Sequence, residues 1–217
     1  MTPGYPSNPE APVLESDYAN RELREITFDQ QLKIGRFKAY DYFGDESFYL
    51  LDTPGHSIAH MCALARTNKD GSGDDTFVFM GGDCAHHCAE FRPTTYLPLP
   101  AEVTCSDIGL EGKATLQGQR FVDLHPEHSA VKPFYYCNPR TAYNFEEAEW
   151  SLEGMEEFDA HPNILTMAAH DDTLLTPMKD LFLPRPLNGW REGRIRENVL
   201  WRFLGEFPEI QADVAKA

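Results

Sequence analysis

The stretch Tyr49–Arg66 reads YLLDTPGHSIAHMCALAR: an apolar run, a Pro-Gly turn and a second apolar run. This pattern predicts a strand, a tight turn and a second strand. The turn presents His56, and His60 stands where the second strand begins. A polar loop between two strands would explain these histidines, and so would a metal-ligand role for His56. The rest of the chain is needed to choose between the two.

Similar apolar runs surround this stretch and predict a series of antiparallel strands over residues 25–82. One of them, FVFM at 77–80, is apolar throughout, as expected of a strand that is buried on both faces. A hairpin is expected at Gly44, between the second and third strands. The predicted strands are EITFD (25–29), LKIGRFKAYDYF (32–43), SFYLLDT (47–53), HMCALAR (60–66) and TFVFMGG (76–82).

The second half of the chain predicts helices and one further strand. Apolar residues recur at helical spacing over 145–158, Asn144 and Glu147 form an N-terminal capping box, and His161-Pro162 ends this helix. NILTMAAH (163–170) predicts a buried strand, and GRIRENVLWRFLGEF (193–207) predicts a late helix that ends at Pro208.

The domain organisation expected from these patterns is one domain over 25–217, preceded by an extended arm over 1–24. Residues 91–143 contain many prolines and isolated hydrophobic residues and predict an irregular surface insertion. Strands followed by helices around a buried strand predict the α/β class, as a layered α+β domain.

Composition excludes several classes of function. The 217 residues carry a net charge of -16, which repels nucleic acid and anionic membrane surfaces and argues against a nuclease. No stretch approaches the ~18 apolar residues of a membrane span, and the N-terminus lacks the pattern of a secretory signal. The five cysteines form no disulfide framework, which favours reduced thiols and a cytoplasmic location. DCAHHC (83–88) lacks the second cysteine pair of a zinc knot.

Three metal-capable side chains follow predicted strands. His56 follows LLDTPG, Asp83 follows FVFMGG and His170 follows ILTMAA. Each alone is explained as well by a turn or by an ordinary histidine. Together, two imidazoles and a carboxylate at strand ends are the ligand types of a zinc hydrolase.

DTPGHSIAHMCAL (52–64), TFVFMGGDCAHH (76–87) and ILTMAAHDD (164–172) resemble, in order, the third, fourth and fifth metal-binding motifs of the metallo-β-lactamase superfamily. The wider sequence, from about residue 3 to 207, is similar to a fungal branch of lactonase-like and lactamase-like hydrolases. The resemblance implies an αββα sandwich. It also implies a hydroxide between two zinc ions that attacks the carbonyl of a lactone, lactam, ester or thioester; manganese or iron could replace zinc.

The resemblance also implies roles for individual residues. His56 would bind the first metal, Asp83 would bridge both, and His170 would bind the second. His60 would support the site without binding metal. His86 and His87 are expected to contact the metal ligands without binding metal themselves, although their placement next to Asp83 could also be chance.

The superfamily's signature His-x-His-x-Asp-His does not occur in the chain, whose eight histidines are at 56, 60, 86, 87, 125, 128, 161 and 170. The expectation is therefore a partial sandwich without its N-terminal half. Each metal would keep two protein ligands, so weak zinc binding and impaired hydrolysis are expected. Exposed edges and apolar faces would lower stability or favour a homodimer. The alternative is a truncated, inactive paralogue that keeps only the fold.

Overall fold

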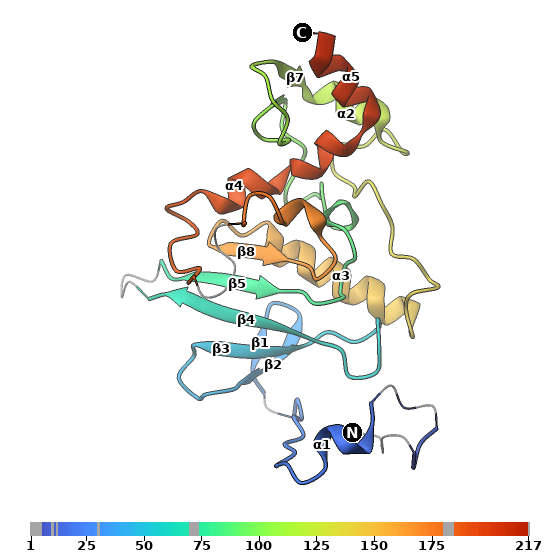
Figure 1. The fold of residues 1–217 in the computed structure, drawn as a ribbon, viewed down its shortest axis with the longest axis vertical. Coiled ribbons are helices and arrows are strands. Elements are labelled where there is room, and N and C mark those ends of the chain that lie inside the picture. The colour runs from blue at the N-terminus through green and yellow to red at the C-terminus, as the bar shows by residue number, and fades with distance from the viewer. Residues whose placement is uncertain are drawn as a thin grey trace.

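The computed structural model describes residues 6–9, 11, 13–29, 31–69, 74–179 and 185–216. At its centre lies a six-stranded sheet of order β1-β2-β3-β4-β5-β8 (Figure 1). β1 to β5 pair antiparallel, and β8 joins β5 in parallel. This mixed, mostly antiparallel sheet confirms an α+β layered fold. The strands are β1 (Lys33–Ile34), β2 (Phe37–Asp41), β3 (Phe48–Asp52), β4 (Met61–Asn68), β5 (Thr76–Met80) and β8 (Ile164–Met167).

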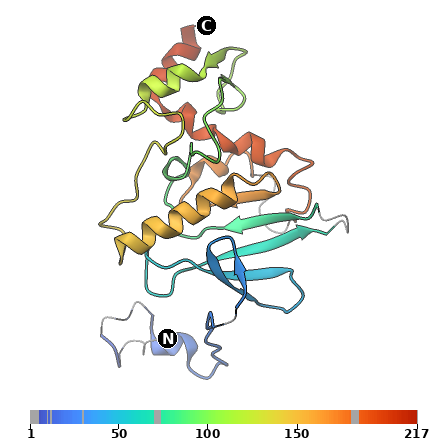
Figure 2. The same ribbon diagram turned by 180° about the vertical axis from the view of Figure 1, so that it is seen from behind.

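Helices cover the sheet unevenly. The longest helix, α3, lies along one face, as Figure 2 shows from its own side, and α4 lies beside β8 (Figure 1). At the C-terminal end, α2 and α5 gather beside a small two-stranded sheet, and α1 lies at the opposite end. The α-helices are α1 (Glu15–Tyr18), α2 (Gly118–Leu124), α3 (Phe145–Asp159), α4 (Ile195–Leu200) and α5 (Pro208–Lys216), and the small sheet is β6 (Glu102–Thr104) with β7 (Thr115–Gln117). Short 3-10 helices span Cys88–Glu90, Asp172–Leu174 and Arg202–Glu206.

β5 is buried on both faces, as its apolar sequence predicted. Phe79 packs into the core cluster on the α3 face, and its neighbour Val78 packs into a second cluster with Trp190 and Val199 on the other face. β8 divides in the same way, with Ile164 in the first cluster and Leu165 in the second. Successive side chains of a strand point to opposite faces, so these two central strands need cover on both sides.

α3 begins and ends where the sequence predicted. The Asn144 side chain accepts a hydrogen bond from the Glu147 amide at 3.3 Å, which satisfies one of the free donors of the first turn. The helix ends at Asp159, just before His161-Pro162.

Three local predictions were wrong. Residues 25–29 form no strand; no described strand pairs with them, and the Arg24 guanidinium lies over the rings of Tyr40 and Tyr42 instead. LKIGRFKAYDYF is split into the hairpin β1–β2 by Gly35, whose φ is +58°. The single helix predicted over 193–207 is split into α4 and a 3-10 helix over Arg202–Glu206, and Pro208 then begins α5. A first helical residue needs no amide hydrogen, and the proline ring presets a helical φ.

Residues 91–143 are mostly irregular, and several of their side chains are buried in the main core. They contain β6, β7 and α2, and they contribute Phe91, Phe121 and Phe134 to the main core. Arg92 is buried against Asp159 of α3, with two hydrogen bonds of 2.6 and 2.8 Å and side chains only 1% and 2% exposed. Residues 91–143 therefore contribute to the same core cluster as the central sheet and α3.

All five cysteines are free thiols, and four of them are buried. Within the described ranges, no helix has the length and apolar character needed to cross a membrane.

Candidate metal-binding site

The three motif residues meet at one edge of the sheet. His56 lies in the turn between β3 and β4, Asp83 follows β5 and His170 follows β8. Backbone hydrogen bonds continue the β5–β8 pairing beyond the strands: the Gly81 amide donates to the Met167 carbonyl at 2.7 Å, and the Ala169 amide to the Gly82 carbonyl at 2.8 Å. The parallel pairing of these strands is what brings Asp83 and His170 together.

The turn that carries His56 is fixed by the start of α3. The Asn144 amide donates to the Gly55 carbonyl at 2.9 Å, the Tyr143 amide to the His56 carbonyl at 3.0 Å, and the Ser151 hydroxyl to the Pro54 carbonyl at 2.7 Å. Gly55 has a φ of +123°, and a Cβ there would lie 2.1 Å from the Ala148 nitrogen. Only glycine allows the turn to approach the helix this closely.

One imidazole lies beside each carboxylate oxygen of Asp83. His170 Nε2 lies 3.0 Å from Oδ1, and His56 Nε2 lies 3.6 Å from Oδ2. The side chains are partly open to solvent, with 36% of Asp83, 59% of His170 and 25% of His56 exposed. One carboxylate therefore connects two separate histidines, the arrangement expected if Asp83 bridges two ions.

His60 contacts the backbone of the site. Its Nε2 accepts a hydrogen bond from the Asp83 amide at 3.3 Å, and its Nδ1 lies 2.9 Å from the Thr53 carbonyl. Burial lowers the pKa of His60, so the ring is neutral near pH 7, with its hydrogen on Nδ1. His60 thus connects the end of β3 to the loop that carries Asp83.

His86 and His87 differ in their surroundings. The His86 ring lies between the rings of His56 and His170, at centroid distances of 5.0 and 5.3 Å. His87 faces the C-terminal segment: its Nε2 lies 3.1 Å from Glu206, and its Nδ1 accepts from the Ala89 amide at 3.1 Å. The structure therefore brings His86 to the group around Asp83, and it does not bring His87 there.

The donor atoms fit only part of a metal centre. Neighbouring ligands of a tetrahedral zinc are roughly 3.3 Å apart when each bond is ~2.0 Å long. The two His–Asp83 pairs, at 3.0 and 3.6 Å, lie on either side of this spacing. However, among the residues with described positions, no group of three or more His, Cys, Asp or Glu side chains is arranged to hold a metal ion. These residues alone thus do not form a complete metal centre.

Sequence patterns missed the residues that position this site. Thr53 and Ser151 act through hydrogen bonds to the His60 ring and the Pro54 carbonyl, and the amides of Tyr143 and Asn144 hold the turn. The contacts from α3 join segments about 90 residues apart along the chain, so no local spacing marks them. Gly55, which directly precedes a candidate ligand, was the available signal.

Fungal hydrolases resemble this chain over most of its length. The metallo-hydrolase mfmC of Annulohypoxylon moriforme is 41% identical over 94% of the chain and 52% of its own length. The gamma-lactamase FDB1 of Fusarium pseudograminearum is 38% identical over 99% of the chain and 51% of its own length. The gamma-lactamase MBL2 of Gibberella moniliformis is 44% identical over 72% of the chain and 62% of its own length.

The chain spans about half the length of the first two of these relatives. No protein-family model matches the chain, and no solved structure matches it. The names and identities of the three relatives confirm the resemblance that the sequence motifs predicted.

Proposed function

Because the chain is homologous to fungal metallo-β-lactamase-like hydrolases, we propose that it acts in metal-dependent hydrolysis of a small carbonyl compound. Lactones, lactams, esters and thioesters are all hydrolysed by attack of water or hydroxide on a carbonyl carbon. A γ-lactam is the first substrate class to test, since two of the three relatives are named gamma-lactamases. The β1–β8 sheet with α3 on one face would correspond to one half of an αββα sandwich.

The observation that carries this proposal is the placement of His56 and His170 on opposite oxygens of Asp83. These residues would supply part of a centre for zinc, manganese or iron. A divalent ion contributes Lewis acidity and makes water more acidic. In the chain itself, His60 holds the Asp83 backbone, and the start of α3 holds the His56 turn. Each ion would have at most two protein ligands from these residues, one imidazole and one Asp83 oxygen, so we expect weak metal binding and slow hydrolysis.

Metal affinity at equilibrium tests the proposed ligands. Zinc or manganese is titrated into the purified chain against a fluorescent chelator, with Asp83→Asn as the test variant. Asp172→Asn is the control, because Asp172 is an exposed carboxylate two residues from His170. We expect Asp83→Asn to weaken binding by about tenfold or more and Asp172→Asn to leave it unchanged. Equal affinity in both variants would contradict the ligand assignment.

Turnover tests the reaction itself. A panel of γ-lactams, lactones, esters and thioesters is incubated with the metal-loaded chain and with the metal-loaded Asp83→Asn variant. Slow hydrolysis by the wild-type chain that the variant loses supports the proposal. Hydrolysis that is equal in both proteins would be contamination or background and would overturn it.

A second candidate function is a homologue that keeps the fold without the chemistry. The lack of any complete ligand group among the described residues favours it. Metal binding indistinguishable between wild type and Asp83→Asn, together with no turnover on the panel, would establish this candidate. We further propose a cytoplasmic protein that forms no complex with nucleic acid or membranes and can form homodimers.

A further inference from the structure

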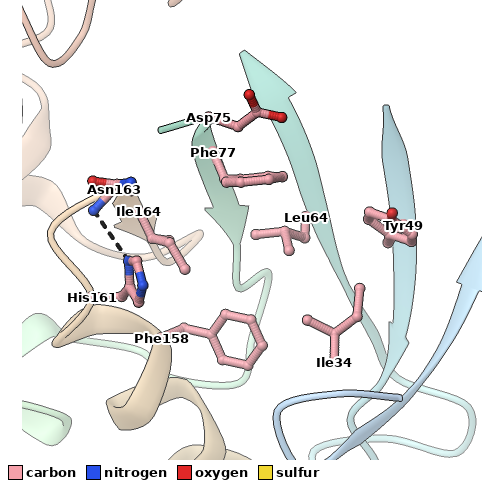
Figure 3. Close-up of a pocket in the computed structure, with 9 residues that line it drawn as sticks. All are labelled: Ile34, Tyr49, Leu64, Asp75, Phe77, Phe158, His161, Asn163 and Ile164. Carbon is pink, nitrogen blue, oxygen red and sulfur yellow. Dashed lines mark hydrogen bonds between the residues drawn. The ribbon is translucent and has the colours of Figure 1, made fainter. Parts of the chain in front are cut away.

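A pocket lies at the end of the sheet opposite Asp83. It has a volume of about 380 Å³, within the range of ~300–1,000 Å³ typical of small-molecule sites. Its walls come from β1, β3, β4, β5, the last turn of α3 and β8 (Figure 3). The lining residues are Ile34, Tyr49, Leu64, Asp75, Phe77, Phe158, His161, Asn163 and Ile164.

The pocket exists because α3 stops before the sheet does. The helix ends at Asp159, and the chain then turns back into β8 at Ile164. The apolar side chains of Leu64, Phe77 and Ile164 lie on the same face of the sheet as α3, and Phe158 forms the wall on the helix side (Figure 3). The part of this face beyond the helix end is therefore left open.

The floor of the pocket is firmly packed. Leu64, Phe158 and Ile164 are 4%, 6% and 8% exposed and belong to the main core cluster. The Phe158 ring lies 4.9 Å from that of Phe79 and stacks on that of Phe37 at 5.8 Å. A ligand would therefore meet a preformed apolar surface, which lowers the cost of ordering the site on binding.

The polar rim favours a neutral ligand with hydrogen-bond acceptors. Asp75 lies 3.5 Å from Arg66, so its charge is already countered, and an anion would meet both this carboxylate and a chain of net charge -16. Burial raises the pKa of the Tyr49 hydroxyl, which keeps its hydrogen near pH 7. His161 Nδ1 accepts from the Asn163 backbone amide at 3.3 Å, which leaves Nε2 as the ring nitrogen that can donate. Both groups can donate.

We propose that this pocket binds a small, neutral, mainly apolar molecule of one or two rings that carries a carbonyl or ether oxygen. The site is distinct from the Asp83 group, because the length of β5, roughly 16 Å at ~3.3 Å per residue, lies between them. Binding here needs no metal and no hydrolysis, so it stands or fails independently of the proposed activity.

The test uses 1-indanone, a neutral bicyclic ketone that a hydrolase of lactones or lactams cannot cleave. Methyl NMR spectra of the full chain follow Ile34, Leu64 and Ile164 during the titration, with Val78, Leu165 and Val199 as reporters of the opposite face. We expect saturable shifts confined to the pocket methyl groups, with a Kd on the order of millimolar. Benzoate, an anion of similar size, should produce none of these shifts.

Ile34→Trp should fill the pocket from its rim and weaken 1-indanone binding by about tenfold or more. Leu50→Trp is the matched control, since Leu50 is a partly buried residue whose neighbour in β3 is Tyr49 and whose side chain points to the other face. It should leave the Kd within about twofold. If Ile34→Trp fails to fold, nuclear Overhauser effects between 1-indanone and the three pocket methyl groups of the wild type decide. Equal shifts on both faces, no shifts, or an unchanged Kd in a folded Ile34→Trp would overturn the proposal.

Discussion

The molecule holds charged groups in two contrasting ways. Arg92 and Asp159 are 1% and 2% exposed and satisfy each other through two hydrogen bonds. Asp83 is 36% exposed, and each of its oxygens faces a single imidazole. A buried, fully paired charge stabilises the packed core, because removing either group leaves the other charge buried and unpaired. A half-exposed carboxylate at a strand end keeps room for another ligand, as a site for chemistry requires.

The largest effect should come from breaking the buried pair. Arg92→Met removes the partner of Asp159 and should lower the free energy of unfolding by about 3–5 kcal/mol. Urea denaturation measures the change. Arg120→Met is the control, because Arg120 pairs with Asp213 near the surface and should cost under ~1 kcal/mol. Similar losses in both variants would remove the contrast between buried and exposed charges.

The second effect concerns the turn beside Asp83. Gly55→Ala introduces a Cβ 2.1 Å from the Ala148 nitrogen and should lower the free energy of unfolding by about 2–4 kcal/mol. Gly44→Ala is a matched control, because Gly44 also has a positive φ, +75°, but has no atom within 4 Å of the added Cβ. Strain alone should cost the control about 1 kcal/mol. Thermal and urea unfolding of the two variants should differ; if they agree, α3 does not fix the turn through this close approach.

Glu156 on α3 is a third kind of charge, a half-buried carboxyl group beside other carboxylates. Burial, followed by the nearby Glu153, raises its pKa to about 7 from 4.5. Between these pH values the unfolded chain loses the proton first, so this group makes the protein less stable as pH rises. The free energy of unfolding of Glu156→Gln should therefore exceed that of wild type by about 1–2 kcal/mol at pH 8, after allowance for solvent screening. At pH 4 the two should be equal.

Urea unfolding of Glu156→Gln across that pH range measures the gain. Glu149→Gln removes an exposed carboxylate from the same helix and is the control for the loss of a charge on α3. A gain that is constant with pH would mean that packing, and not the proton, is responsible.

The smallest effect on stability should come from Asp83 itself. Asp83→Ala removes a half-exposed side chain and should change the free energy of unfolding by about 0.5 kcal/mol or less. The His60 contact would survive, because it is made to the Asp83 amide. Chemical denaturation without added metal measures this change. A loss of several kcal/mol would show that Asp83 serves the fold, as Asp159 does.

Local patterns predicted the elements that depend on nearby residues. The apolar run over 76–80, the turn at Gly44 and the capped start of α3 were all correctly placed, since each depends on a few neighbouring side chains. The split at Gly35 and the start of α5 at Pro208 were missed because each residue type has two common uses, and distant packing selects one of them.

The candidate site was only partly predictable for the same reason. The residue types at three strand ends identified His56, Asp83 and His170, and the β5–β8 pairing brought the last two together. The different surroundings of His86 and His87 could not be predicted, because Glu206, which faces His87, lies more than a hundred residues away in the sequence. Adjacent positions in a loop carry no periodicity that shows where each side chain points.

α3 connects the two ends of the sheet. Its first turns bind the loop of His56, and its last turn supplies Phe158 to the apolar pocket. The helix has 15 residues, a length of roughly 22 Å at ~1.5 Å per residue. A displacement of the helix along its axis would therefore move the His56 loop and the pocket wall together, so the spacing between the two ends is set by the length of one rigid element.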